Sequence, residues 1–464
     1  MARQTTVTSA IRHVGEVEDN ELRARLHDLE PLCLRTRTPS LAMIARSAGS
    51  YHWTADGRKL ADFTSGVLVA NLGHNPASWW QNLLRYLNLN LPADADATEF
   101  LSAVPLTTYN ASCPIEVEAS DRLLKSLRSA SGGKRMEQIL WSASGSEAAQ
   151  KALWACMARR PGSDMILATR GGFHGKKGLA GAVTGCEEDA ERDPRVRFIS
   201  FPKSECESIE RRSMPIDLQP YREELQQLAN EFGDRLCCLI TEPYLGGGGS
   251  FHPQPEYLQM LEQFCRDQDI AFVLDEIQAN FGRTGSMYAF TQYGVEPDIV
   301  LLGKGLGNGI PVDACVGRAD LFACLGYGEG SDTWSGHPLG CAAVLATLDE
   351  FESKDIVARA VPLANTIQKR LLKLCELPAV AMVRGEGTVW GVECADIGDV
   401  SAPEIAMQAV EACYRGNSAG DAVHLLGPLA GRVIRIAPPL TMAVEEAEHY
   451  LQVMHEILAE LPAA

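Results

Sequence analysis

The sequence contains no cluster of five or more lysines and arginines, and its overall charge is strongly negative. Over 464 residues, 60 acidic side chains oppose 42 basic ones, which gives a formal net charge of −18. Nucleic-acid binding depends on many Lys and Arg contacts to phosphate, so such a surface disfavours it. We therefore expect no nucleic-acid partner, although local backbone amides can still bind a small anion.

Patterns typical of metal sites, disulfide scaffolds and membrane proteins are also lacking. The 14 cysteines are scattered, with Cys237-Cys238 as the one close pair, and no Cys/His group has zinc-ligand spacing. We expect no metal site from this pattern. Met1 to Gly15 lacks the apolar stretch of a secretory signal, and no apolar run approaches the ~18 residues of a membrane span. These features predict a cytoplasmic protein with no membrane partner.

The composition is that of a large globular protein. Hydrophobic residues make up 46% of the chain and charged residues 22%, and the length indicates two or three structural units. Near the N-terminus, the spacing predicts a surface helix over Glu18–Leu29. Alternating polarity around the turn Asp56-Gly57 predicts a β-hairpin over Gly49–Phe63.

From about Glu116 the chain alternates helical segments with short apolar strands, which predicts a buried, mostly parallel sheet covered on both faces. The expected helices are Pro114–Leu127, Gly145–Arg159 and Tyr257–Gln268, and the expected strands are Asp164–Ala168, Leu236–Thr241, Ile270–Leu274 and Ile299–Leu302.

After Pro338 the pattern changes to that of a smaller α+β domain. Its expected helices are Leu339–Phe351, Ile356–Cys375 and Val444–Leu461, and its expected strands are Val380–Val383, Val389–Val392 and Val433–Ile436. We therefore divide the chain into an N-terminal segment, residues 1–95, that contributes to the small domain, a large α/β domain, 96–338, and the C-terminal small domain, 339–464.

Three features fall where the strands of such a sheet end and ligands usually bind. The loop Ser142–Gln150 (SASGSEAAQ) opens a helix with small residues, which suits an anion but equally an ordinary helix cap. Asp275 and Glu276 directly follow a strand, where a carboxylate can pair with a buried cation, bind a metal or lie in a solvated turn.

The third feature is Lys304, a single lysine in IVLLGKGLGNG that follows four apolar residues and a glycine. At the end of a buried strand, a lysine can have a depressed pKa and act as a nucleophile. It can also bind phosphate, but the P-loop pattern fails because Gly305 stands where Ser or Thr is required.

Together these features resemble the class III (subgroup II) pyridoxal-phosphate aminotransferases of fold type I. The resemblance runs from about Gly49 to about Met442, and its most specific part is VLDEIQANFGRTG followed by PDIVLLGKGLGNGIP. It implies an α/β fold with a large domain around a mostly parallel, seven-stranded-type sheet, plus a smaller α+β domain. It also implies pyridoxal 5'-phosphate as cofactor and a homodimer with active sites at its interface.

The resemblance assigns roles residue by residue. Lys304 matches the lysine that holds the cofactor as a Schiff base and moves the substrate proton. Asp275 matches the carboxylate that pairs with the pyridine nitrogen, and Gln278 matches the partner of the ring's phenolic oxygen. Gly145 and Ser146 match the phosphate-binding loop.

The remaining assignments surround that centre. Phe173 matches the aromatic residue that stacks on the ring, and His174 is expected to orient Asp275 from behind. Glu242 matches the glutamate of an EP pair, and Thr333 matches a residue that reaches the phosphate from the neighbouring subunit. Arg435 matches the arginine that binds a substrate carboxylate with its two-pronged guanidinium.

Two positions depart from the family pattern. Gly247 stands where many members carry a glutamate that gates the carboxylate-binding arginine. His337 replaces a usual asparagine, and we interpret it as structural. The four glycines at 246–249 leave room or mobility in the expected pocket.

The sequence thus predicts an aminotransferase that moves an amino group from an amino acid or amine donor to a keto acid through Lys304. A decarboxylase, racemase or aminomutase on the same scaffold is the alternative, because fold and cofactor do not settle reaction type. A non-catalytic ligand sensor would be expected to lack Lys304 or Asp275, and both are present.

Overall fold

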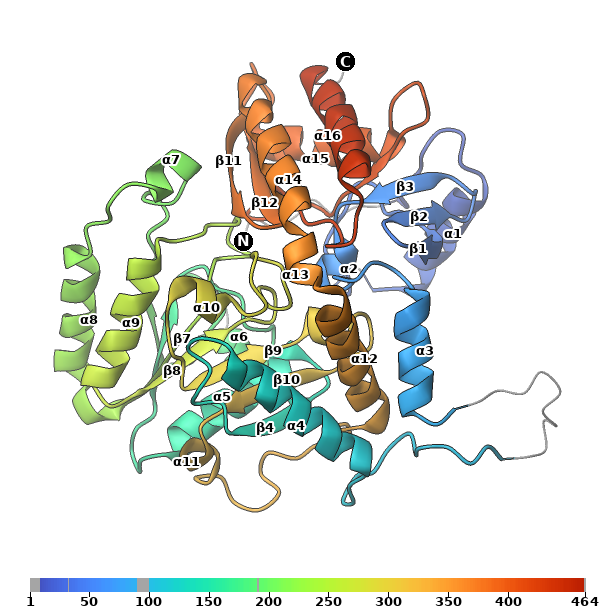
Figure 1. Cartoon of the computed structure of the whole chain (residues 1–464). Coiled ribbons are helices and arrows are strands. Elements are labelled where there is room, and N and C mark those ends of the chain that lie inside the picture. The colour runs from blue at the N-terminus through green and yellow to red at the C-terminus, as the bar shows by residue number, and fades with distance from the viewer. Residues whose placement is uncertain (1–8, 32, 90–99, 190–191, 463–464) are drawn as a thin grey trace. The chain divides into compact units, whose positions relative to one another are not determined.

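The structure is a computed structural model that describes residues 9–31, 33–89, 100–189 and 192–462 (Figure 1). It divides into two compact units. The first comprises the chain to Asn75, Glu207–Ile209 and the chain from Arg359, and the second comprises Pro76–Cys206 and Glu210–Ala358. These limits differ from the sequence-based boundaries after residues 95 and 338, and those domain boundaries stay a prediction.

The second unit is built on a seven-stranded sheet in the part of the chain that the structure describes. Its order is β4 (Gln138–Ser142), β10 (Asp313–Gly317), β9 (Ile299–Leu302), β8 (Ala271–Asp275), β7 (Leu236–Thr241), β5 (Met165–Thr169) and β6 (Val196–Ile199). Strands β9, β8, β7, β5 and β6 are parallel, and β10 is antiparallel to both of its neighbours. The predicted mostly parallel sheet is confirmed.

Both faces of this sheet are buried, which explains why its strands are apolar throughout rather than alternating. On one face, α5 (Gly145–Ala158) packs its alanines against every second strand residue, such as Ile166, Ile240 and Val273. The intervening residues, such as Leu239 and Phe272, are also buried. Helix α9 (Pro255–Asp267) packs against β8 and β7, and Figure 1 draws it in yellow-green.

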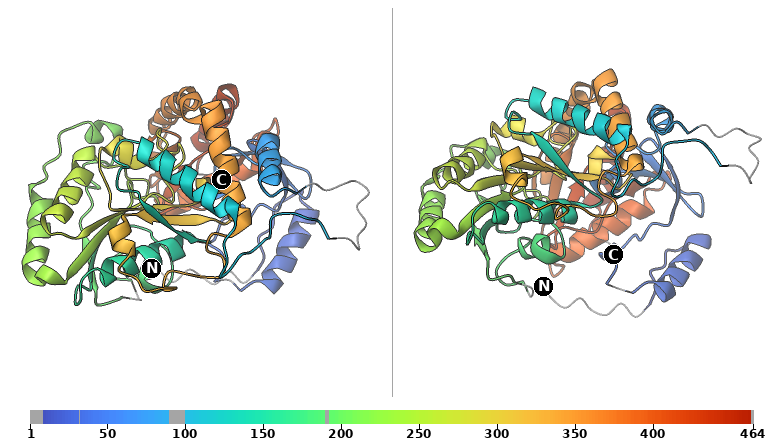
Figure 2. Two further views of the ribbon diagram at one scale, coloured as in Figure 1. Left: turned by 60° about the horizontal axis from the view of Figure 1, so that its bottom comes forward. Right: turned by 90° about the horizontal axis from the view of Figure 1, so that it is seen from below.

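Other helices complete the second unit. The long helix α4 (Pro114–Ser129) packs against α12 (Pro338–Lys354), which also packs against α3 (Ala77–Tyr86), and α4 appears in cyan in Figure 2. The remaining helices of this unit are α6 (Gly178–Ala182), α8 (Gln219–Phe232), α10 (Ala289–Tyr293), α11 (Ala319–Phe322) and the 3₁₀ turns η1 (Gly233–Arg235) and η2 (Lys304–Leu306). Helices α7 (Ile209–Arg212) and α13 (Ile356–Arg359) each contain residues of both units.

The first unit contains two small sheets. One has the order β1 (Ile44–Ala48), β2 (Tyr51–Thr54), β3 (Lys59–Asp62) and β13 (Val423–His424), and the other has the order β11 (Val380–Glu386), β12 (Val389–Cys394) and β14 (Val433–Ile436). The predicted hairpin is present as β2 and β3, and the C-terminal strand β13 extends it in parallel.

Helices α14 (Val361–Leu372), α15 (Ala402–Arg415) and α16 (Val444–Ala459) enclose the core of this unit around Trp390, Ile405 and Ile434. Helix α1 (Glu18–Leu29) has the predicted bounds, and α2 (Ser65–Leu68) is one short turn. The single helix predicted over Ile356–Cys375 is wrong. The chain breaks at Ala360 into α13, α14 and the 3₁₀ turn η3 (Lys373–Glu376), because Pro362 lacks an N–H and suits the first turn of a new helix.

No helix in the described ranges combines the length and apolarity needed to cross a membrane.

Candidate active site

Three neighbouring parallel strands of the second unit end at one edge of its sheet. Leu274 on β8 pairs with Thr241 on β7 and with Val300 on β9, so the residues that follow these strands emerge side by side. They are Glu242 after β7, Asp275 at the end of β8, and Lys304 just beyond β9. This carboxyl edge is where open α/β sheets bind ligands.

Asp275 is held rigidly by two hydrogen bonds. Its Oδ2 lies 2.8 Å from Nδ1 of His174, and its Oδ1 accepts the N–H of Ile277 at 3.1 Å. Both side chains are almost fully buried. The structure therefore brings two of the predicted site residues, His174 and Asp275, into direct contact.

Glu242 ties the neighbouring strand end to two loops. Its Oε2 accepts the N–H of Phe173 at 2.8 Å, and its Oε1 accepts the N–H of Gly246 at 3.3 Å. Burial raises the pKa of this carboxyl to about 7, and the nearby charge of Asp275 adds to that effect. Glu242 thus orients the turn that carries Phe173, a residue that is 44% exposed.

Gln278 packs against the loop that contains the four glycines at 246–249. The Oε1 of Gln278 accepts the hydroxyl proton of Tyr244 at 2.9 Å, which turns the amide N–H₂ away from Tyr244. A Cβ placed on Gly246 would lie 1.9 Å from that Oε1, so a side chain at this position would displace the Gln278 amide. At Gly247 a Cβ would meet the Cβ of Phe173 at 3.4 Å, an ordinary contact distance. The absence of a side chain at Gly247 is therefore not imposed by lack of space.

Lys304 occupies a strained position. It has a φ of 48°, in the left-handed region that side chains other than those of Gly, Asn and Asp rarely adopt, and it begins the 3₁₀ turn η2. The preceding residue, Gly303, is in close contact with a carboxylate, because a Cβ there would lie 1.8 Å from Oδ1 of Asp313. The turn is fixed further by Asn280, whose Nδ2 donates to the carbonyl of Gly303 at 3.2 Å.

Asp313 is a site residue that the sequence analysis missed. It begins β10, pairs with Ser142 in register, and is buried. Burial raises the pKa of its carboxyl to about 7, while the positive charge of Lys304 lowers it and the charges of Asp275 and Glu147 raise it. The edge that carries Lys304 therefore holds a third buried acid besides Glu242 and Asp275. A polar residue at the start of an otherwise apolar strand was the available signal.

The start of α5 forms the predicted small-residue loop. Ser144 accepts the N–H of Glu147 at 3.4 Å, and Glu147 accepts the N–H of Ala143 at 2.9 Å. These bonds show that the loop is a helix cap, as the ordinary interpretation expects. The N–H groups of Gly145 and Ser146 lie in the first turn and have no intrahelical partner. Ser146 also faces Gly175, where a Cβ would lie 2.5 Å from its Oγ.

Thr333 is exposed on a loop of the same unit. Its neighbours Asp332 and Ser335 are bound by Nζ of Lys151 on α5, at 2.7 and 2.9 Å. His337 follows, and its Nδ1 accepts the N–H of Gly340 at 3.2 Å while Nε2 faces the carbonyl of Pro311 at 3.0 Å. His337 thus caps α12, which agrees with its structural interpretation.

Arg435 belongs to the first unit and is buried there in β14, opposite Gly391 of β12. The other predicted site residues, Gly145, Ser146, Phe173, His174, Glu242, Asp275, Gln278, Lys304 and Thr333, all belong to the second unit.

A model of the class-III aminotransferase family matches residues 34–458. The chain belongs to this family. It is 29% identical over 429 residues to the 2-aminoadipate transaminase of Pseudomonas putida, covering 88% of this chain and 94% of that one. It is 26% identical to the acetylornithine aminotransferase of Oceanobacillus iheyensis, covering 90% and 93%.

Solved structures agree on the fold. The ornithine aminotransferase of Toxoplasma gondii superposes with a TM-score of 0.77 at 22% identity, covering 94% of each chain. An amine transaminase from an uncultivated Pseudomonas species superposes with a TM-score of 0.74 at 25% identity, covering 97% of this chain and 98% of that one. The predicted fold type I and aminotransferase class are confirmed, and the alternative of a decarboxylase, racemase or aminomutase is not favoured.

Class-III aminotransferases depend on pyridoxal 5'-phosphate, and the carboxyl edge of the sheet suits that group. Asp275 offers a fixed, buried carboxylate for a cationic ring nitrogen, and the first turn of α5 offers N–H groups for a phosphate. Gly303 and Gly246 keep the edge free of side chains that would fill it. The residues present therefore fit the cofactor.

Proposed function

We propose that this aminotransferase binds pyridoxal 5'-phosphate at the carboxyl edge of β7, β8 and β9, with Lys304 as its covalent attachment point. The observation that carries the proposal is the buried pair His174–Asp275, joined at 2.8 Å beside the strained turn of Lys304. Bound pyridoxal phosphate supplies an electron sink for negative charge at the substrate's α-carbon.

In this proposal the chain's own groups have distinct tasks. Asp275, oriented by His174 and the N–H of Ile277, would keep a proton on the ring nitrogen of the cofactor. Gln278 would hold the cofactor through its phenolic oxygen, and Phe173 would stack on its ring. Gly145 and Ser146 bind the phosphate with their N–H groups, joined by Thr333 of the partner subunit. With the cofactor bound, the ε-amine of Lys304 would move the proton at the substrate's α-carbon.

Asp313 completes the electrostatics of this edge. As a neutral acid it adds no negative charge to this edge, and as a carboxylate it stabilises the ammonium form of Lys304. We infer that it exchanges between these two states as the charge on Lys304 changes during the cycle. Glu242 acts through the backbone, by orienting the turn that carries Phe173.

We further propose that Arg435 binds the carboxylate of the substrate, since a planar guanidinium can grip a carboxylate with two parallel hydrogen bonds. With glycine at position 247 no glutamate gates this arginine, which favours an amino acid donor over a simple amine. The names of the relatives suggest 2-aminoadipate, acetylornithine, ornithine and 4-aminobutyrate as the first donors to test. The acceptor is a keto acid, and the enzyme is a cytoplasmic homodimer.

The experiment is a single half-reaction followed by absorbance. The cofactor-loaded enzyme is mixed with each donor and no acceptor, and both the cofactor spectrum and the released keto acid are measured. We expect conversion to the amine form of the cofactor, with one keto acid released per active site, and recovery of the original spectrum when a keto acid is added. A simple amine without a carboxylate serves as the matched comparison. Release of carbon dioxide, or racemised donor without keto acid, would contradict transamination.

A further inference from the structure

A group of buried histidines in the first unit lies around one carboxylate. His74 Nε2 lies 2.7 Å from Oδ2 of Asp62, and His52 Nε2 lies 3.5 Å from the same oxygen. His52 and Asp62 are almost fully buried, and the side chain of His74 is 15% exposed. One nitrogen from each imidazole and one carboxylate oxygen lie within 4.8 Å of one another.

The sheet explains how these residues meet. His52 pairs with Leu60 in the β2–β3 register, so it shares a face with Asp62, two residues further along β3. His424 on β13 pairs directly with Asp62, which brings a third imidazole to that face. Its ring lies 5.2 Å from that of His52, and its Nδ1 is buried without a hydrogen-bond partner among the described residues.

His74 reaches the group from outside the sheet. Its backbone exchanges two hydrogen bonds with Gly49, at 2.8 and 2.9 Å, which fixes the loop beside β2. Because its side chain is partly exposed, it also provides a path from solvent to the group.

The buried negative charge of Asp62 requires a compensating positive charge nearby. Its Oδ1 already accepts the N–H and the hydroxyl of Thr64, at 2.8 and 2.6 Å, which leaves Oδ2 to the imidazoles. Among the described residues, the ion pairs of Asp62 involve these two histidines and no lysine or arginine. A buried carboxylate is stable only with a compensating positive charge.

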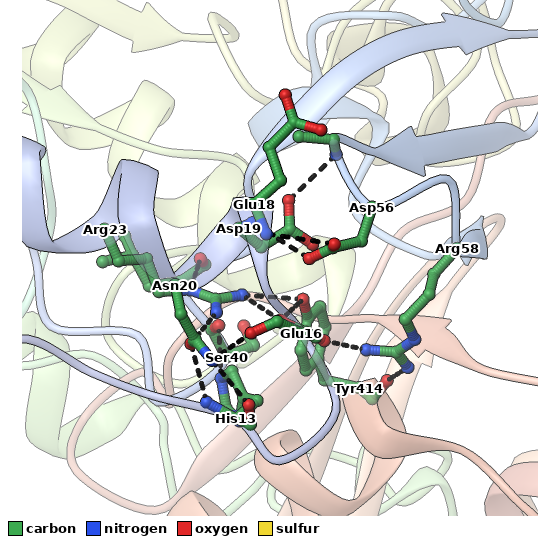
Figure 3. Close-up of polar contacts among 12 residues, drawn as sticks. His13, Glu16, Glu18, Asp19, Asn20, Arg23, Ser40, Asp56, Arg58 and Tyr414 are labelled. Carbon is green, nitrogen blue, oxygen red and sulfur yellow. Dashed lines mark hydrogen bonds and ion pairs between the residues drawn. The ribbon is translucent and has the colours of Figure 1, made fainter.

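A second acidic group in the same unit provides the contrast. Glu16, Asp19 and Asp56 also converge, but Glu16 is paired with Arg23 at 2.7 Å and with Arg58 (Figure 3). Asp56 accepts three backbone N–H groups at the start of α1, at 2.9 to 3.2 Å (Figure 3). Arginines and a helix end therefore neutralise this group, and it needs no metal.

We propose that His52, Asp62 and His74 bind a divalent transition metal ion of the zinc class, with His424 within reach as a fourth ligand. Imidazole and carboxylate are the ligands that Zn²⁺ accepts at 2.0–2.2 Å, which places tetrahedral neighbours roughly 3.3 Å apart. The observed separations of 2.7 and 3.5 Å require only small side-chain movements to reach that spacing.

Two further observations support a metal. His52 Nδ1 lies 2.7 Å from Oγ of Ser47, the outer hydrogen bond that typically orients a metal-binding imidazole and directs its other nitrogen to the ion. The Nδ1 of His424 is buried without a hydrogen-bond partner among the described residues, so it is available to a metal ion. The site would join β2, β3, β13 and the loop of His74 within one unit.

The test uses the full-length, cofactor-loaded protein after removal of metals with a chelator. Zn²⁺ binding is measured by calorimetry, Co²⁺ binding by its visible absorption, and the melting temperature with and without metal. We expect one ion per chain and a higher melting temperature. His52→Gln and His74→Gln should each weaken binding at least a hundredfold, and Ser47→Ala about tenfold. His449→Gln, an exposed histidine paired with Asp421 at 3.0 Å, is the matched control and should bind as the wild type does.

Unchanged binding in both His52→Gln and His74→Gln, or no binding of either metal at millimolar concentration, would overturn the proposal. If the variants fail to fold, X-ray absorption at the zinc edge of the wild-type protein decides. Scattering from at least two imidazoles supports the site, and sulfur ligands or water alone overturn it. None of these measurements depends on transaminase activity, so the result is independent of the proposed function.

Discussion

Replacing Asp313 by asparagine tests whether this buried acid is neutral in the folded protein. Burial raises the pKa of Asp313 to about 7 from a usual value of 3.8. The folded protein then binds a proton that the unfolded chain has lost between those two pH values. The stability of the folded state therefore falls as pH rises from about 4 to about 7 and stays constant above that.

The magnitude follows from the size of the shift. One pKa unit corresponds to about 1.36 kcal/mol, so a shift of roughly three units destabilises the folded state by about 4 kcal/mol at pH 8, as an order of magnitude. About 1.5 kcal/mol of this is already present at pH 5. Asparagine has nearly the same shape and does not ionise. Asp313→Asn should thus gain about 2–3 kcal/mol more, relative to wild type, at pH 8 than at pH 5.

The assay compares urea unfolding of the cofactor-free wild type and Asp313→Asn at both pH values. The pH-dependent part of the difference isolates ionisation from any change in packing. Asp320→Asn is the matched control, because the side chain of Asp320 is 57% exposed and Arg318 lowers its pKa, which gives the opposite sign. A stability difference between Asp313→Asn and wild type that is the same at pH 5 and pH 8 would show that Asp313 is ionised throughout, as a fixed partner of Lys304.

Three further substitutions test the proposed roles. Lys304→Ala should leave a folded protein that binds cofactor weakly and turns over no donor, and a rate within tenfold of wild type would refute the assignment. Asp275→Asn removes a buried charge held by His174, so stopped-flow measurement of the half-reaction should show a loss of about 10²–10³ in rate, equal to ~3–4 kcal/mol. A loss of only a few-fold would make the carboxylate structural. Arg435→Lys keeps the charge but loses the two-pronged grip, so it should raise KM for a keto acid and leave a carboxylate-free amine unaffected. Equal effects on both would remove Arg435 from the binding site.

Elements with a strong local signal were predictable from the sequence. Strands β7 and β9 have the predicted bounds because they are short apolar runs between turn or polar residues, and α1 has them because of its helical spacing. Strands β4, β6 and β10 were missed. β10 begins with the polar Asp313 and ends with Gly317, so its sequence gives only a weak strand signal. It forms a strand because it pairs with both β4 and β9 in the buried sheet.

The site residues that could be predicted are those that stand at the end of a strand or directly after one. Asp275 and Lys304 stand in a local pattern, one at the end of a buried strand and the other within two residues of one, and strand order alone brings them to the same edge. Asp313 comes to that edge from the opposite direction, because β10 is antiparallel and starts where β9 ends. The sequence gives even less indication that the proposed metal ligands lie together, namely His52, Asp62, His74 and His424. They meet through the hairpin register, a parallel pairing with a strand from the other end of the chain, and a backbone bridge to Gly49. A ligand set assembled by three separate pairings leaves no spacing for a motif, so only the folded arrangement reveals it.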